Sequence, residues 1–314
     1  MPIDFFMTLN VFVVSLVLLV LTSQAAIKYS VRFAKLTGIS QLAIGFLLLA
    51  VATSLPELSI AVLSSLYGEG LLSVGNVLGA NISNLLLIFG VLALIRNFAI
   101  KKEQYGQVLR AVTITTLIAF VAYLLGFINM IFGLTLLVMF FIFSWTIMRS
   151  GYSTDRTKPD SSAQTVAKTG AIVLGCVTLV VLSGRLVTDA AITIAGELGV
   201  GESLIGATIL AIGTTLPELS VNIAAIRRGA IGLAVGDSIG SIITNLTLVL
   251  GTAATINSIT LGPVERAVAL AFIGTALLFL FLSARATFNR RLGLILLGLY
   301  ALYIIGISTY GAIV

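Results

Sequence analysis

Long apolar segments separated by short polar connections run along almost the entire chain. Each segment is close to the roughly 20 residues that a helix needs to cross a bilayer, and is too long for a strand buried in a core. Asp4 rather than a basic region precedes the first segment, so we interpret it as a retained helix and not a signal peptide. The pattern predicts ten transmembrane helices near residues 5–26, 39–66, 71–95, 107–127, 129–148, 170–194, 203–226, 230–257, 264–284 and 292–312.

Composition supports the membrane assignment and removes several classes of function. Hydrophobic residues make up 59% of the 314 residues and charged residues only 10%, whereas soluble domains are usually about 25% charged. Cys176 is the only cysteine and histidine is absent, which excludes an intrachain disulfide, a thiolate metal cluster and histidine-ligated metals. We expect no bound cofactor and no enzymatic activity.

The basic residues predict the orientation of the chain. When the N-terminus is placed outside, all but two of the 18 lysines and arginines fall in inner connections, the exceptions being Arg185 and Arg266. The positive-inside rule then predicts a multi-pass protein of the cell membrane with both termini extracellular. Nucleic-acid binding is disfavoured because the charges are spread over five short loops, whereas contact with anionic lipids stays open.

One seven-residue run occurs twice. Thr-Ser-Leu-Pro-Glu-Leu-Ser at 53–59 returns as Thr-Thr-Leu-Pro-Glu-Leu-Ser at 214–220, so the two glutamates are 161 residues apart. Residues 44–90 align with 205–251 without a gap and share 20 of 47 positions, including the proline, the glutamate and an asparagine. This similarity indicates an internal duplication.

The duplication predicts the domain organisation. We expect an N-terminal five-helix repeat over 1–150, a cytoplasmic connector over 151–169 and a C-terminal five-helix repeat over 170–314. Because five is odd, the second repeat enters the membrane in the opposite sense, as in many secondary transporters. The predicted fold is therefore an all-α integral membrane protein of ten transmembrane helices arranged as two inverted repeats.

The repeated run places unusual groups at membrane depth. Pro56 has no N–H, so the Ala52 carbonyl loses its usual partner, and the helix is expected to bend near Ala50 to Thr53. Freed carbonyls and carboxylates in a membrane must meet protein, water or an ion. The two copies together supply carboxylates, hydroxyls and carbonyls, which are hard oxygen donors suited to Ca²⁺ or Na⁺. A structural role for Glu57 and Glu218 as buried neutral acids is disfavoured, because such an acid would not need duplicating with its proline.

Polar stripes on two further helices accompany the repeated run. The third helix carries Asn76, Ala80 and Asn84 at four-residue spacing, and glycines flank the stripe. In the eighth helix the stripe is Asp237, Ser241 and Asn245. Two alternative interpretations stay open: Asn84 and Asn245 only bond across helices, and Asp237 bonds the backbone or a cytoplasmic group near Arg227 and Arg228.

Other acidic residues are expected to be solvated. Asp189, Glu197 and Glu202 are predicted to lie at the outer end of the seventh helix, away from any ion site.

The repeated runs resemble the alpha repeats of the Ca²⁺/cation antiporter superfamily, most closely the prokaryotic relatives of Na⁺/Ca²⁺ exchangers. The resemblance rests on Thr-Ser-Leu-Pro-Glu at 53–57 followed by Gly-Asn…Gly…Asn at 75–84, and covers about a third of the chain directly. It implies that Glu57 and Glu218 bridge a central Ca²⁺ and that Na⁺ competes for shared ligands. Beyond these two glutamates, the implied ligands are the carbonyls of Thr53 and Thr214 for Ca²⁺, the carbonyls of Ala50 and Ala211 and the hydroxyls of Ser54, Thr215 and Ser241 for Na⁺, and Asn84 and Asn245 lining the middle of the site.

Three positions depart from the pattern of this superfamily. Ala80 stands where a serine hydroxyl is frequent, which weakens or removes one Na⁺ site. Asn245 replaces an aspartate found in some relatives, and Asp237 replaces the asparagine of the Gly-Asn pair, which makes it a further candidate ligand. The glutamate context typical of H⁺-coupled members is absent, so Na⁺ is favoured over H⁺ as the counter-ion.

The sequence thus favours a secondary antiporter that exchanges Ca²⁺ for Na⁺. An H⁺/Ca²⁺ exchanger of the same fold and a cation channel with a carboxylate ring remain alternatives. An intramembrane hydrolase is disfavoured because Asp237 has no second aspartate in an equivalent context. The expected partners are inorganic cations and the lipid bilayer, with no obligate protein partner.

Overall fold

The computed structural model describes residues 3–68, 70–100, 102–150, 162–197, 211–285 and 287–313. Within these ranges, eight helices are long and apolar enough to cross a membrane, and a ninth is counted if the bent pair Gln41–Thr53 and Leu55–Leu66 is one span. The expected seventh helix is described only from Ala211, as α11 (Ala211–Thr214) and α12 (Leu216–Arg227). The described chain is therefore a mostly helical membrane fold, as predicted, while the number ten and the inversion of the repeats stay predictions.

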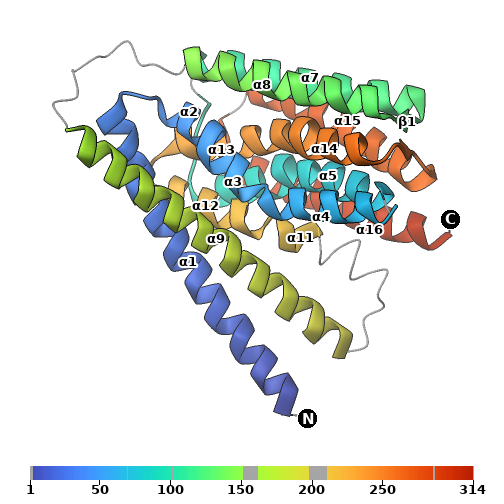
Figure 1. The fold of residues 1–314 in the computed structure, drawn as a ribbon, viewed down its shortest axis with the longest axis horizontal. Helices are drawn as coiled ribbons and strands as arrows, with labels where there is room; N and C mark the ends of the chain where they lie inside the picture. Colours follow the sequence, from blue (N-terminus) through green and yellow to red (C-terminus); the bar gives the residue numbers. More distant parts are fainter. Residues whose placement is uncertain are drawn as a thin grey trace.

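Two helices are much longer than their apolar segments indicated. α1 (Ile3–Thr37) and α9 (Ala163–Glu197) each have 35 residues, whereas 5–26 and 170–194 were expected. At 1.5 Å per residue each is about 52 Å long, well beyond a hydrocarbon core of roughly 30 Å, so both must tilt or extend past it. They lie side by side along one flank and run in opposite directions (Figure 1), with Gly170 near the start of α9 facing Phe33 near the end of α1.

The centre of the molecule is built from helices interrupted by short π-helical turns. From Leu55 in the first repeat and Leu216 in the second, its described elements recur at an offset of 161 residues with equal lengths, so the second repeat reproduces the local structure of the first there. The first set is α2 (Gln41–Ile44), η1 (Gly45–Ala50), α3 (Val51–Thr53), α4 (Leu55–Leu66), α5 (Gly70–Ser83), η2 (Asn84–Ile88) and α6 (Phe89–Ile95); the second is α11, α12, α13 (Ile231–Thr244), η4 (Asn245–Val249) and α14 (Leu250–Ile256).

The outer helices of each half pack against the central helices of the other half. α8 (Met130–Ser150) packs on α14, and α16 (Arg290–Ile313) packs on α6, where Gly293 and Gly90 allow close approach. α7 (Lys102–Leu125) packs on α15 (Pro263–Arg285). Strand β1 (Phe127–Ile128) pairs antiparallel with β2 (Ile259–Thr260), which again joins the two halves. The halves therefore interlock rather than forming two separate cores.

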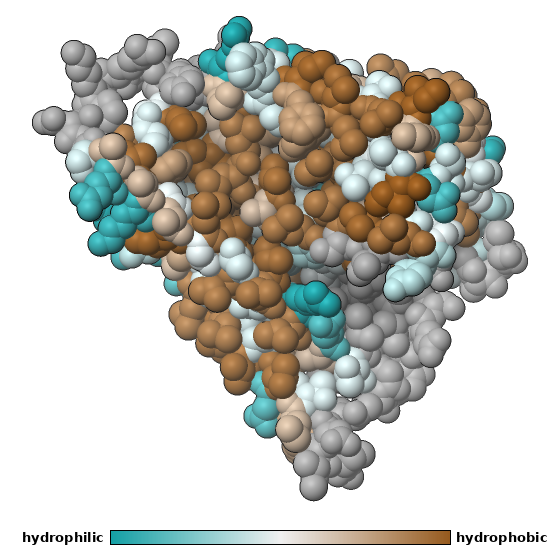
Figure 2. Space-filling model, in the orientation of Figure 1, coloured by the Kyte–Doolittle hydropathy of each residue, from teal (hydrophilic) through white to brown (hydrophobic). Residues whose placement is uncertain are grey.

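Burial separates a central layer from a periphery. In the spans Gly70–Ile95 and Ile231–Ile256, 78% of the most apolar window is buried, compared with 17% in Phe6–Thr37. The visible face in Figure 2 is apolar over most of the helices, with hydrophilic residues gathered mainly toward its edges. The buried centre nevertheless holds many polar side chains, and these form the candidate site.

Candidate cation-binding site

The two repeated runs each break a helix two residues before the proline. Ser54 (φ −81°, ψ 7°) separates α3 from α4, and Thr215 (φ −88°, ψ −1°) separates α11 from α12. The two parts of the first broken helix differ in direction by 43°. The predicted bend is therefore present, but the break falls at Ser54, just beyond the expected Ala50–Thr53 turn, because the proline ring crowds the turn that precedes it. The break lets the new helix begin with its N-terminus inside the protein.

Glu57 and Glu218 lie in the first turns of α4 and α12 and are fully buried. The Glu218 carboxyl is within electrostatic range of Glu57 and of Asp237, so the two repeats bring their glutamates together and turn neither toward lipid. The Thr214 side chain lies beside Glu57, and the Thr53 side chain lies beside Glu218. None of the four glutamate oxygens has a hydrogen bond of good geometry to a described residue.

The two threonines connect the repeats crosswise. The Thr53 hydroxyl lies 3.0 Å from the Leu49 carbonyl oxygen, to which it donates, and 3.4 Å from Oδ1 of Asp237. The Thr214 hydroxyl lies 3.4 Å from Oδ1 of Asn76, which occupies the position equivalent to Asp237. The same contact is thus made twice, once to a carboxylate and once to an amide.

Asp237 is held by a residue that the sequence analysis did not identify. Nδ2 of Asn222 donates to Oδ2 of Asp237 at 2.5 Å and to the Glu218 carbonyl at 2.9 Å. Both side chains are fully buried, so the interpretation that Asp237 bonds a cytoplasmic group near Arg227 and Arg228 is wrong. The only sequence signal for Asn222 was its polarity at a position where the first repeat has an alanine.

The asparagines of the two stripes behave differently. Nδ2 of Asn245 donates to Oδ1 of Asn81 at 3.0 Å, and Nδ2 of Asn81 donates to the Ile242 carbonyl at 3.2 Å. Asn245 therefore does bond across helices, through an asparagine that sequence reasoning missed. Asn84 is fully buried, and neither atom of its amide has a hydrogen-bond partner among the described residues.

Of the remaining predicted ligands, most are buried in the same central layer. The hydroxyls of Ser54 and Ser241 are buried and lack a hydrogen-bond partner in the described ranges, and Thr215 is also buried. The Ala50 carbonyl already accepts the Ser54 N–H at 3.1 Å. Ala211 begins α11, and its side chain lies outside the described residues.

The chemistry of this donor set is that of a hard-cation site. In the part of the chain that the structure describes, no lysine or arginine pairs with Glu57, Glu218 or Asp237, and no cluster of three or more acidic, histidine or cysteine side chains forms a metal site. An ion at the glutamates would therefore be completed by hydroxyl, amide and main-chain oxygens, which suit Na⁺ or Ca²⁺ rather than soft metals.

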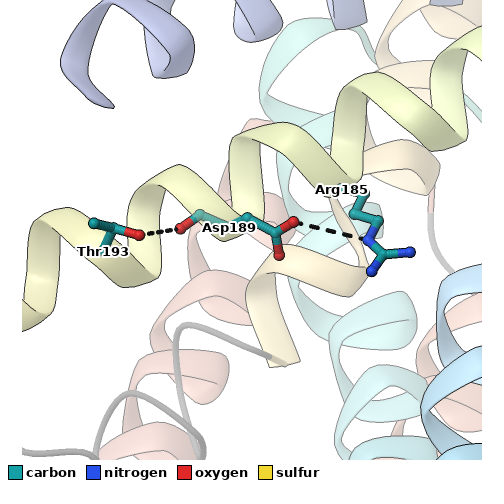
Figure 3. A network of polar contacts seen from close by, with 3 residues as sticks. All are labelled: Arg185, Asp189 and Thr193. Atoms are coloured by element: carbon teal, nitrogen blue, oxygen red, sulfur yellow. Dashed lines mark hydrogen bonds and ion pairs between the residues drawn. The ribbon is translucent and has the colours of Figure 1, made fainter. Parts of the chain in front are cut away.

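Asp189 shows how an acid outside this centre behaves. It lies on α9, not at the outer end of the seventh helix as expected, and its exposed side chain pairs with Arg185 at 3.7 Å (Figure 3). Its carbonyl accepts the Thr193 hydroxyl at 2.9 Å. The side chain of Glu197 and all of Glu202 lie outside the described residues. Asp189 thus belongs to the surface of the helix and not to the ion site.

Comparisons with known proteins agree with this geometry. A family described as sodium/calcium exchanger protein matches residues 7–149 and 168–309, that is, once in each half. The chain is 32% identical to inner membrane protein YrbG of Escherichia coli, over 78% of each chain. It is 31% identical to an uncharacterized membrane protein, MJ0091, of Methanocaldococcus jannaschii, over 95% of this chain and 96% of that protein. A structure of the sodium-calcium exchanger NCX_Mj soaked with Na⁺ and Sr²⁺ superimposes with a TM-score of 0.86 at 26% identity, covering 97% of this chain and 99% of the other.

Proposed function

Since this chain belongs to the sodium/calcium exchanger protein family, we propose that it is a secondary antiporter that exchanges Ca²⁺ against Na⁺ by alternating access. The observation that carries the proposal is the meeting of Glu57 and Glu218, from equivalent positions of two repeats, in a fully buried site rich in oxygen donors. The likeness to the sodium-calcium exchanger NCX_Mj supports the choice of ions.

Electrostatics explains why such a site exchanges ions rather than leaking them. Two carboxylates neutralise one Ca²⁺ or two Na⁺, so either load lets the site pass a low-dielectric barrier. An empty site with two ionised carboxylates would retain a large desolvation penalty, because no described basic residue pairs with them. The site therefore changes its exposure only when loaded, which couples the movement of one ion to the other.

We assign ligand roles according to the position of each group. Glu57 and Glu218 bridge Ca²⁺, and both also serve Na⁺. The other ligands are the carbonyls of Thr53 and Thr214 for Ca²⁺, the carbonyls of Ala50 and Ala211 and the hydroxyls of Ser54, Thr215 and Ser241 for Na⁺, with Asn84, Asn245 and Asp237 as further groups around the centre.

The proposed mechanism uses ten helices in two inverted repeats, with both termini outside. The opposite directions of α1 and α9 (Figure 1) and the recurrence of the central elements support this topology. In the proposed movement α1 and α9 slide together across a central layer that stays fixed. Sliding suits these two helices because they pack mainly on each other along their length.

Flux in proteoliposomes tests the function. We expect ⁴⁵Ca²⁺ uptake into Na⁺-loaded vesicles when external Na⁺ is removed, and no uptake under a pH gradient alone. Uptake driven only by the pH gradient would instead identify H⁺ as the counter-ion. Ca²⁺ flux that needs no counter-ion gradient and carries current would identify a channel and contradict exchange.

A further inference from the structure

A basic hollow lies between two helices that belong to different repeats. Lys28, Arg32 and Lys35 stand on one face of α1, and Arg228 at the end of α12 faces them across a hollow of about 360 Å³. A water molecule occupies roughly 30 Å³, so this space admits a much larger group. All four basic side chains are exposed.

An apolar groove continues from this hollow along the same two helices. It is about 370 Å³ in volume and is lined on α1 by Val20 and Gln24, which precede Lys28 at four-residue steps. On α12 it is lined by Ser220, Ile223 and Ala224 and, at its basic end, by Arg227, and Arg228 borders both hollows. The surface between the helices thus changes from apolar to strongly basic in the direction of the last turns of α1.

The basic end has no acidic partner within the described ranges. The one ion pair in the described ranges joins Arg185 to Asp189 on α9, away from this hollow. The Lys28 ammonium lies over the ring of its neighbour Tyr29, 5.7 Å from the ring centroid. The positive-inside rule accounts for basic residues at this end of the helices. It does not account for their convergence on one hollow from two helices, nor for the apolar groove that leads into it.

We propose that this groove is a binding site for one anionic phospholipid. The phosphate lies among Lys28, Arg32, Lys35 and Arg228, where the two guanidinium groups donate in pairs to its oxygens. An acyl chain follows the apolar lining past Val20 and Ile223. The basic end coincides with the side predicted to be cytoplasmic, where anionic lipids accumulate. The lipid touches both α1 and α12 and therefore links the proposed sliding helix to the central layer.

Native mass spectrometry of the full chain tests the site without any transport assay. The purified protein is titrated with dioleoyl-phosphatidylglycerol and, separately, with dioleoyl-phosphatidylcholine of equal chain length. We expect wild-type protein to retain one phosphatidylglycerol in strong preference. In Arg32→Gln/Arg228→Gln the preference falls by about 20- to 30-fold, since each basic group near a headgroup contributes roughly a fivefold preference.

Two further variants make the result specific. Arg290→Gln/Arg291→Gln removes the same charge at the exposed start of α16 and is expected to keep the wild-type preference. Arg32→Lys/Arg228→Lys keeps the charge and should retain most of the preference, which also controls for folding. The proposal is overturned if wild-type protein binds both lipids equally, or if the Arg290 and Arg291 variant loses the preference as fully as the Arg32 and Arg228 variant.

Discussion

The two repeats share the parts that present a carboxylate but differ in the parts that surround it. Both break a helix one residue before Leu-Pro-Glu, both bury the glutamate completely, and both begin a π-helical turn at an asparagine. These shared elements place one buried carboxyl group from each repeat in the central layer. The duplication has therefore conserved the geometry of the centre within one chain.

The two repeats differ in the residues near their glutamates. The first repeat has Ala61, Asn76 and Ala80, where the second has Asn222, Asp237 and Ser241. The exchange of Asn76 for Asp237 is matched by that of Ala61 for Asn222, because the extra carboxylate oxygen of Asp237 meets the extra amide donor at 2.5 Å. The second repeat thus carries one more carboxyl group and one more hydroxyl group, and the site is asymmetric although its scaffold is not.

Loss of either glutamate should lower ion exchange more than any other change considered, and by a similar factor in both repeats. Glu57→Gln and Glu218→Gln each remove half of the charge that compensates Ca²⁺, so we expect ⁴⁵Ca²⁺ exchange in proteoliposomes to fall at least about 100-fold in both. Asp189→Asn, which removes an exposed acid paired with Arg185, is the matched control and should stay within about twofold of wild type. Normal exchange by one of the two glutamine variants would break the equivalence of the repeats.

Close packing between the repeats provides a second test. A Cβ on Gly240 would lie 2.6 Å from the Ala50 side chain, so α13 approaches the first repeat's broken helix only because glycine stands there. We expect Gly240→Ala to lower the free energy of unfolding by about 1–3 kcal/mol through overpacking, with a lower melting temperature in detergent. Gly274→Ala on α15, where no described atom lies within 4 Å of the added Cβ, should not destabilise. Equal melting temperatures for both variants would show that the close approach is not required.

The Asn222–Asp237 pair can be tested by converting the second repeat to the first. Asn222→Ala leaves Oδ2 of Asp237 without its Asn222 donor. Asp237→Asn replaces one carboxylate oxygen with an amide nitrogen, so either the contact with Asn222 or the contact with Thr53 loses its acceptor. Each single change should cost about 1–3 kcal/mol of unfolding free energy. The double variant reproduces Ala61 and Asn76, so the two costs should not add, with a coupling of about 1–2 kcal/mol in chemical denaturation. Strict additivity would mean that the pair does not act as a unit.

The smallest expected effect concerns the hydroxyl that only the second repeat has. Ala80→Ser adds to α5 the group that Ser241 supplies on α13, and should make Na⁺ a stronger competitor of ⁴⁵Ca²⁺ uptake by about two- to tenfold. Ser241→Ala should weaken the competition of Na⁺ with ⁴⁵Ca²⁺ uptake by a similar factor. If both variants keep the wild-type Na⁺ dependence, neither position contributes to a Na⁺ site.

The sequence could predict what the repeat itself encodes. Two copies of a proline beside a glutamate predicted the broken helices and the meeting of Glu57 with Glu218, because duplication shows which polar residues belong together. The same logic failed where the repeats differ. Asn222 has no counterpart in the first repeat, and its partner Asp237 lies on another helix, so no periodicity indicates it. The Asn81 bond to Asn245 joins residues 164 positions apart and depends on how α5 packs against η4.

The apolar pattern of the sequence also underestimated the lengths of α1 and α9. The segments 5–26 and 170–194 contain the mainly apolar stretches alone, whereas α1 continues past its segment through Lys28 and Arg32 to Thr37, and α9 begins seven residues before its segment, at Ala163. Hydropathy reports the part of a helix that lipid covers, while mutual packing decides where the helix ends. That extension carries the basic residues which face α12.

Anomalous diffraction from crystals soaked in Sr²⁺, a Ca²⁺ substitute, tests the central claim most directly. We predict a single strong peak at the centre of the molecule, with carboxylate oxygens of both Glu57 and Glu218 at Ca²⁺-type distances of roughly 2.3–2.6 Å. A peak ligated by only one glutamate, or one that lies at Asp237 and away from the pair, would contradict the account.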